Sequence, residues 1–334
     1  MLMQPMLLRL QQRLPEAQID VLASPWTEAL LRHMPEVHEV IINPFPHGVL
    51  KLFARYRLGR QLRARHYNQA IVLPNSSKSA LPPFFAGIPL RTGFVGELRY
   101  GLLNDARKLN KAALPLMVER FAQLAEAPGV KIQRPIPRPK LRVSAEQQQN
   151  AINKLGLSLG QPVAVFCPGA EYGPAKRWPI PYFAELAQTL RLQGYVVWLI
   201  GSAKDKEIGD KIVALGNNAS RNLCGKTDLA DAIALLSCAD LVVSNDSGLM
   251  HLAAALDRTM LALYGSSSPN FTPPLSENAH VLKLDLPCSP CFKRVCPLGH
   301  FNCMIKLTPK QVAQHLPIKA SETHLTIEKR HEPA

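Results

Sequence analysis

Short apolar runs that are typical of buried strands alternate along this chain with longer stretches of helical periodicity, and this alternation limits the fold more than any other feature. The runs at residues 163–167 (VAVFC) and 239–244 (ADLVVS) each lead through a glycine-containing turn into a helix-like segment. Such alternation is typical of α/β proteins with largely parallel sheets. Because 334 residues exceed what one hydrophobic core usually holds, we expect two domains.

The expected elements follow from the same periodicities. Strands are predicted at residues 18–23, 40–43, 69–73, 90–93, 163–167, 195–200, 239–244 and 260–264. Helices are predicted at residues 50–65, 182–193 and 248–256, and the chain opens directly in an amphipathic helix whose apolar positions are Leu7, Leu8, Leu10 and Leu14. A doubly wound domain normally begins with a buried strand and a tight loop instead.

A proline-rich, charged segment at residues 131–140 (KIQRPIPRPK) has the composition of a linker, because its prolines stiffen the chain and forbid helix. We therefore expect an N-terminal Rossmann-like domain over residues 1–145 and a C-terminal one over residues 146–320. The polar, charged residues 321–334 are predicted to form a flexible tail.

The chain carries a net charge of +14, from 39 basic and 25 acidic residues. Such an excess indicates an anionic partner, which can be a nucleic acid, an acidic membrane surface or a phosphorylated substrate, and is also compatible with a plain basic surface. The arginines are denser in the first half. No apolar run reaches the roughly 20 residues of a membrane span, and no secretion signal is visible, so we expect a cytoplasmic protein.

The segment at residues 245–251 (NDSGLMH) lies where a strand ends and a helix begins. Asp246 or Ser247 can cap that helix, and its free N–H groups can hold a diphosphate. Gly248 would let a ligand approach the backbone, and His251 lies one turn further on. A plain N-cap beside a buried histidine explains this pattern equally well.

A loop rich in glycine and proline follows the strand at residues 163–167 and contains Lys176, which is placed to neutralise a leaving diphosphate. Ligands of open α/β sheets bind beyond the carboxyl ends of such strands. After the next strand, Asp205 could bond a ribose hydroxyl. The chain has no G-x-G-x-x-G motif and no P-loop, which disfavours a nicotinamide-dependent oxidoreductase or an NTPase.

Four of the seven cysteines crowd into one stretch, which suggests a small metal site with zinc as the first candidate. Their spacing differs from the paired C-x2-C knuckles of common zinc modules. Reduced thiols without a ligand, or a labile disulfide, together explain the cluster about as well. The four residues are Cys288, Cys291, Cys296 and Cys303.

Several segments in order resemble the ADP-heptose:lipopolysaccharide heptosyltransferases: residues 167–179, 245–251 and 263–269 in the second half, and residues 73–80, 84–89, 91–93 and 99–105 in the first. The resemblance runs over nearly the whole chain. It implies a GT-B fold, which has two Rossmann-like domains that face a central cleft. It also implies inverting transfer of L-glycero-D-manno-heptose from ADP-heptose to heptosyl-Kdo2-lipid A, at the cytoplasmic face of the inner membrane and without a metal ion or other cofactor.

The resemblance assigns residues as well. Donor binding in the C-terminal domain falls to Ala170, Lys176, Asp205, Thr227, Asp246, Ser247, Gly248 and His251. Among these, Lys176, Asp246 and His251 are the expected catalytic residues. Binding of the acidic acceptor in the N-terminal domain falls to Lys78, Arg91 and Arg99.

One departure from the family pattern concerns the general base, because members carry an aspartate on a loop after their first strand and this sequence starts at a position that matches the first helix. We therefore expect a missing central strand, unpaired backbone groups on its neighbours, and little or no transfer. A non-catalytic relative that binds nucleotide-sugars is one alternative. A nucleic-acid-binding protein is another, disfavoured because the arginines are not interleaved with exposed aromatic residues.

Overall fold

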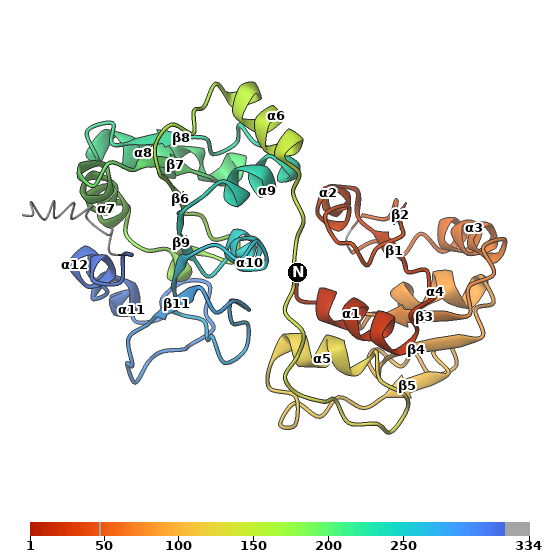
Figure 1. Ribbon diagram of the computed structural model, residues 1–334. Helices are drawn as coiled ribbons and strands as arrows, with labels where there is room; N and C mark the ends of the chain where they lie inside the picture. The colour runs from red at the N-terminus through yellow and green to blue at the C-terminus, as the bar shows by residue number, and fades with distance from the viewer. Residues whose placement is uncertain (47, 318–334) are drawn as a thin grey trace, which may run out of the picture.

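The computed structural model describes residues 1–46 and 48–317. Figure 1 shows two α/β halves that lie side by side, with the N-terminus between them. The chain passes from the first half to the second through one extended segment, which contains the proline-rich stretch at residues 131–140 and no helix or strand. The stretch is thus free of helix, as its prolines predict.

The first half is built from strands and helices that alternate, as their periodicity predicts. Its elements are α1 (Gln4–Arg13), β1 (Asp20–Ala23), the 3-10 helix η1 (Pro25–Thr27), α2 (Glu28–Leu31), β2 (Glu39–Ile42), α3 (Leu52–Arg63), β3 (Gln69–Val72), α4 (Ser77–Phe85), β4 (Leu90–Phe94), β5 (Asp105–Arg107) and α5 (Met117–Gln123). The predicted opening helix is thus present, and Leu7 and Leu10 are buried on its inner face.

The sheet of the first half is in two pieces. β1 and β2 form a parallel pair, and β3, β4 and β5 form a separate parallel sheet. An open cavity of about 1390 Å³ lies between them, lined by β1, by β3 and by apolar side chains of α1. Among the described strands β1 pairs with β2 alone and β3 with β4 alone, which confirms the prediction of unpaired strand edges.

The second half holds one continuous sheet. Its elements are α6 (Ala145–Leu155), β6 (Val163–Cys167), the 3-10 helix η2 (Pro174–Lys176), α7 (Ile180–Leu192), β7 (Val196–Leu199), the 3-10 helix η3 (Ala203–Asp205), α8 (Lys206–Leu215), β8 (Ser220–Asn222), α9 (Leu229–Ser237), β9 (Leu241–Asn245), α10 (Gly248–Ala255), β10 (Met260–Leu263), β11 (Ala279–Leu282), α11 (Asn302–Ile305) and α12 (Pro309–Ala313).

The six strands of this sheet are parallel and stand in the order β11-β10-β9-β6-β7-β8. Every residue of β6, β9 and β10 is buried, because helices cover both faces of the sheet. Alternate residues of β6 belong to different cores: Val165 packs on one face of the sheet and Phe166 on the other. The site described below therefore rests on a rigid layer.

The second half begins at a well-defined helix start. Ser144 caps α6 through a hydrogen bond from the Gln147 N–H to its Oγ, and the Gln147 side chain accepts from the Ser144 N–H. Gly156 ends the helix in the left-handed conformation. The expected domain limits stay a prediction, and the predicted tail at residues 321–334 lies outside the described residues.

Candidate functional site

The strand order reverses between β6 and β9, and this reversal creates a crevice at their carboxyl ends. β6 continues through η2 and α7 to β7 on one side, whereas β9 lies on the other side and leads into α10. Ligands of open α/β sheets bind at such topological switch points. The two segments singled out from the sequence, residues 168–179 and 245–251, follow these two strands and meet here.

Asn245, the last residue of β9, fixes the loop that follows β6. Its Nδ2 donates to the carbonyl oxygen of Pro168 at 2.7 Å, and its Oδ1 accepts from the backbone N–H of Trp178 at 3.0 Å. The buried Trp178 indole donates in turn to the carbonyl of Leu307 at 2.7 Å. The loop is therefore held at both ends. The sequence analysis included Asn245 in the segment at residues 245–251 but gave it no role, although an asparagine at the end of a buried strand is a signal for one.

Lys176 and Asp246 form an ion pair at the centre of the crevice. Lys176 Nζ lies 2.5 Å from Asp246 Oδ2, and the two side chains are only 18% and 5% exposed. Nζ also lies 5.2 Å from the centre of the Tyr172 ring, within the range of a cation–π contact. The structure thus brings together two of the three predicted catalytic residues.

His251, the third predicted catalytic residue, is a partly buried side chain one turn into α10. Its pKa is lowered to about 4, mainly by burial; the Asp246 charge opposes this shift, and the positive charges of the Met1 α-amino group and Lys176 add to it. Burial also lowers the pKa of the Met1 α-amino group to about 6. The imidazole is therefore neutral at pH 7.

The first turn of α10 is left open towards the crevice. Ser247 occupies the N-cap position with an extended backbone, but no side chain caps this helix, so the expected cap by Asp246 or Ser247 is wrong. The N–H groups of the first turn consequently stay available to an anion. A Cβ placed on Gly248 would meet nothing within 4 Å, which shows that space lies beside it.

Two serines that follow β10 add polar groups that sequence reasoning did not assign. Ser266 and Ser267 are 1% and 7% exposed, and their Oγ atoms have no hydrogen-bond partner among the described residues. Buried hydroxyls normally find a partner, so unpaired ones indicate a place where a ligand or water binds. Their signal was the run of three serines after a buried strand.

The remaining predicted donor residues surround the crevice at different depths. Asp205 is buried, and its Oδ2 accepts from the backbone N–H of Ser202 at 2.9 Å and from the Ser202 Oγ at 2.8 Å. A Cβ on Gly169 would lie 2.5 Å from that carboxylate, so glycine is required there. Ala170 is buried beside it, and the half-buried Thr227 follows β8, at the edge of the sheet.

The three predicted acceptor residues differ in how the structure uses them. Arg99 is 1% exposed and donates to the carbonyl oxygens of Phe94 and Pro74. Arg91, near the amino end of β4, donates to the carbonyls of Leu102 and Ile88 at 2.7 and 2.6 Å. Both arginines thus stabilise the backbone of the first half through these hydrogen bonds.

Lys78 differs from the two arginines, because no hydrogen bond or ion pair within the described structure engages its ammonium group. It lies in the first turn of α4, and its side chain has no bonded partner among the described residues. It also lines the cavity between β1 and β3. Its amine is therefore available to an acidic acceptor.

The four clustered cysteines lie around one small cavity behind the Lys176 loop. Cys288, Cys291, Cys296 and Cys303 line it together with Ala175, Ser266 and His300. Their thiols are free, and no three of these sulfurs approach within 4.8 Å of one another in the described structure. The loop they belong to is tied to the Lys176 loop, because the Ala175 N–H donates to the carbonyl of Arg294 at 3.1 Å.

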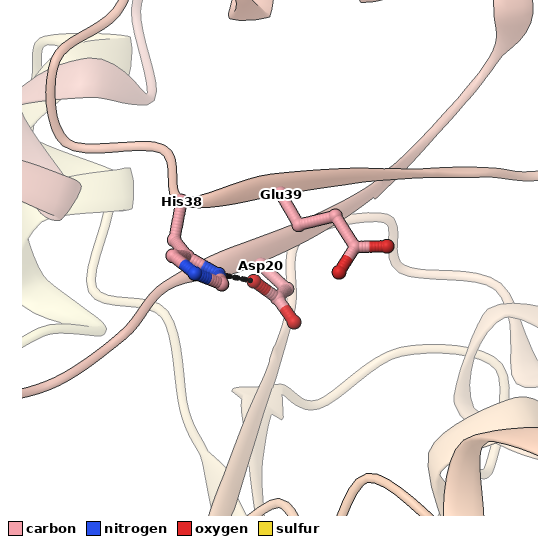
Figure 2. Close-up of side chains that lie close together, drawn as sticks. All are labelled: Asp20, His38 and Glu39. Carbon is pink, nitrogen blue, oxygen red and sulfur yellow. Dashed lines mark hydrogen bonds and ion pairs between the residues drawn. The ribbon is translucent and has the colours of Figure 1, made fainter.

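A second group of potential metal ligands lies elsewhere, at the amino ends of β1 and β2. Figure 2 shows Asp20, His38 and Glu39, whose ligand atoms come within 4.8 Å of one another. His38 Nδ1 lies 2.9 Å from Asp20 Oδ1, the Tyr67 hydroxyl donates to Asp20 Oδ2, and Arg65 pairs with Glu39. Each carboxylate thus has protein partners.

Comparisons with known proteins identify the family of this chain. A family model described as glycosyltransferase family 9 (heptosyltransferase) matches residues 55–302. Lipopolysaccharide heptosyltransferase 2 of Escherichia coli K12 is 48% identical over 325 residues, which cover 95% of this chain and 93% of that protein. Lipooligosaccharide heptosyltransferase 2 of Haemophilus ducreyi is 44% identical over 322 residues, or 92% of each chain.

Solved structures show the same fold. The structure of the E. coli ADP-heptose lipopolysaccharide heptosyltransferase II superimposes with a TM-score of 0.84 at 46% identity, covering 94% of this chain and 92% of that one. A family 9 glycosyltransferase from Veillonella parvula, 21% identical, superimposes with a TM-score of 0.82 over 94% and 91% of the two chains. The predicted α/β fold of the GT-B type is confirmed, and the chain belongs to glycosyltransferase family 9, the heptosyltransferases.

Proposed function

We propose that this chain transfers a heptose from ADP-heptose to the inner core of lipopolysaccharide. The observation that supports the proposal is the Lys176–Asp246 pair beside the open first turn of α10, because a cation and free N–H groups are what a diphosphate needs. The substrates are those in the names of the similar heptosyltransferases. The specific acceptor that we propose is heptosyl-Kdo2-lipid A.

In the proposed reaction the acceptor hydroxyl oxygen attacks C1 of the heptose from the face opposite the diphosphate. The C1–O bond breaks, ADP leaves with the electron pair, and the hydroxyl proton passes to a base. Lys176 neutralises the charge that develops on the leaving diphosphate, while the N–H groups at the start of α10 bind its oxygens. A cation already in the site can do what a metal ion does in other transferases, so we propose that transfer needs none.

The described site offers only a poor general base for the proton of the acceptor hydroxyl. His251 is neutral and could accept the proton, but a pKa of about 4 makes it a poor base at pH 7. A well-matched base is typically worth about 10²- to 10⁴-fold in rate. We therefore expect slow transfer by these residues alone.

We further propose that the chain acts at the cytoplasmic face of the inner membrane, where its lipid-linked acceptor would lie. Lys78 would contact the acidic groups of that acceptor. No helix among the described residues has the length and apolarity that crossing a bilayer requires. The association we propose is therefore peripheral.

The test is ADP release from ADP-heptose with heptosyl-Kdo2-lipid A. Lys176→Ala should abolish the release, whereas Lys211→Ala, which removes an exposed lysine paired with Glu207 on α8, should not change it. Equal loss in both variants, or release that Lys176→Ala leaves intact, would contradict the proposal. If ADP binds but no release occurs with any acceptor, the chain is a nucleotide-sugar-binding relative instead.

A further inference from the structure

One stretch of the first half contains no acidic residue at all. Between Glu39 and Glu97 the 57 residues at 40–96 include eight lysines and arginines and no aspartate or glutamate. They form most of β2 and all of α3, β3, α4 and β4. So long a basic region, without internal ion pairs to neutralise it, provides an electrostatic attraction for an anionic surface.

Within this region, the start of α3 exposes apolar side chains that soluble proteins usually bury. Phe53 is 86% exposed, and Leu50 and Leu52 are 52% and 47% exposed. Val49 and Tyr56 are exposed as well. Single exposed apolar residues need no explanation, but five within eight consecutive positions form a patch that indicates an interaction site.

The fold holds these side chains in their exposed positions. The buried Arg55 donates from Nε to the carbonyl of Leu50 at 2.5 Å and from a terminal nitrogen to the carbonyl of Val49 at 3.1 Å. Its guanidinium also lies 4.2 Å from the centre of the Phe45 ring. The segment before α3 is therefore anchored from beneath and cannot fold its apolar side chains inward.

Basic side chains surround the apolar ones. Lys51 precedes the helix, and Arg57 and Arg60 follow Phe53 and Tyr56 by one helical turn on the same sides of α3. All three are exposed, and no described carboxylate pairs with any of them. An amphipathic helix start with exposed leucine and phenylalanine and with basic flanks is the composition that binds at the interface of an anionic bilayer.

We propose that this surface, the α3 patch (Val49, Leu50, Lys51, Leu52, Phe53, Tyr56, Arg57 and Arg60), docks the protein onto a bilayer that contains anionic lipids. The apolar side chains enter the interface while the basic ones contact the headgroups. A protein partner would not require the 57-residue stretch to lack acidic side chains, and a nucleic acid would not require the leucines.

The patch also lies next to the acceptor side of the cleft. Arg55 donates from its other terminal nitrogen to the carbonyl of Lys78 at 3.1 Å, so the starts of α3 and α4 are adjacent. Docking through the α3 patch would bring Lys78 towards a lipid-linked acceptor. This link between docking and the acceptor rests on the proposed function, whereas lipid binding itself can be measured without heptose transfer.

The experiment is co-sedimentation of the full chain with vesicles of phosphatidylethanolamine and phosphatidylglycerol, compared with vesicles of phosphatidylcholine alone. We expect binding to the anionic vesicles only. Leu52→Ser with Phe53→Ser, and separately Arg57→Gln with Arg60→Gln, should each weaken it by about tenfold or more. The matched controls are Leu192→Ser, which removes a 91% exposed leucine on α7, and Lys310→Gln on α12, and both should bind like the unchanged protein.

Several results would overturn the docking proposal. One is unchanged vesicle binding by both α3 patch variants, whose fold is checked by circular dichroism and thermal unfolding. Another is equal binding of the unchanged protein to phosphatidylcholine. A third is a dimer in sedimentation equilibrium without vesicles that Leu52→Ser with Phe53→Ser dissolves, because the patch would then bind a second copy.

The same variants separate this proposal from the proposed function. With a deacylated, water-soluble acceptor, ADP release should be the same in the α3 patch variants as in the unchanged protein, while release with acceptor in vesicles should fall. If the unchanged protein binds the vesicles but releases no ADP with either acceptor, the proposed function fails and the docking surface stands.

Discussion

Lys176 and Asp246 neutralise each other across the switch point of the C-terminal sheet, with their charged atoms 2.5 Å apart and little exposed to solvent. The pair links the loop after β6 to the loop after β9. Because a diphosphate would compete with Asp246 for the lysine, the carboxylate both holds the amine in place and limits how tightly it binds ADP. This dual role can be tested by removing the partners singly and together.

Lys176→Met should leave Asp246 without a partner in a nearly buried position. We expect it to lower the free energy of unfolding by roughly 2–4 kcal/mol, somewhat below a fully buried pair because the lysine is partly exposed. Lys176→Met with Asp246→Asn should restore most of that stability but not ADP binding. Denaturant unfolding and calorimetric titration with ADP provide the two measurements. Recovery of ADP binding in the double variant would contradict the role given to Lys176.

His251 should make the protein less stable in mild acid. Its pKa is lowered from an ordinary value of 6.5 to about 4 in the folded state, so the unfolded chain binds more protons between these values. Stability therefore rises with pH through this range, and the contribution of at most about 3 kcal/mol is fully present above pH 6.5. Thermal unfolding at pH 7 and pH 5 should show a smaller difference for His251→Gln than for the unchanged protein.

Two glycines of the crevice should respond to alanine in opposite ways. Gly169→Ala would bring a Cβ to 2.5 Å from the Asp205 carboxylate and should destabilise the fold. Gly248→Ala faces open space, so we expect an unchanged melting temperature but weaker ADP binding, because the new methyl group would occupy the space where the diphosphate lies. If Gly248→Ala binds ADP normally, the diphosphate does not approach this turn.

A structural zinc at the four clustered cysteines stays a prediction. About one zinc per chain in atomic-absorption analysis of protein purified under reducing conditions would support it, since four thiolates fill a tetrahedral site once their sulfurs lie closer together than in this structure. Cys296→Ser with Cys303→Ser should remove it, whereas Cys238→Ser, at a half-buried thiol on another helix end, should not. Metal-free protein with four titratable thiols in the cluster would favour the alternative of reduced cysteines without a ligand.

The strongly apolar elements were predictable and the polar ones were not. β6 has the predicted bounds and β9 differs by one or two residues, because both strands are buried throughout and carry a continuous apolar signal. α7 also differs by one or two residues, because its apolar residues recur at helical spacing on one buried face. β5 (DAR) and β8 (SRN) were missed, since short polar edge strands resemble loops. The donor loops were found because they follow the most apolar strands.

The acceptor side was harder to predict, because a sequence does not show which way an arginine points. Arg91 and Arg99 were expected to face an acidic ligand, yet both donate to backbone carbonyls of their own half. Burial lowers the pKa of Arg99, which shows how far its guanidinium is removed from water. By contrast, the side chains of the α3 patch are exposed and the half-buried Lys78 lines the open cavity, and the sequence pattern alone did not show either placement.

The division of the N-terminal sheet affects how the two halves unfold. The C-terminal half has one six-stranded sheet in which every strand is bonded to a neighbour, so its amides should exchange with solvent only through global opening. In the N-terminal half, the pair β1–β2 and the trio β3–β5 share no ladder and are separated by the open cavity. Each can open without the other, so amide exchange should be faster there, and melting should begin in the half that carries Lys78 and the α3 patch.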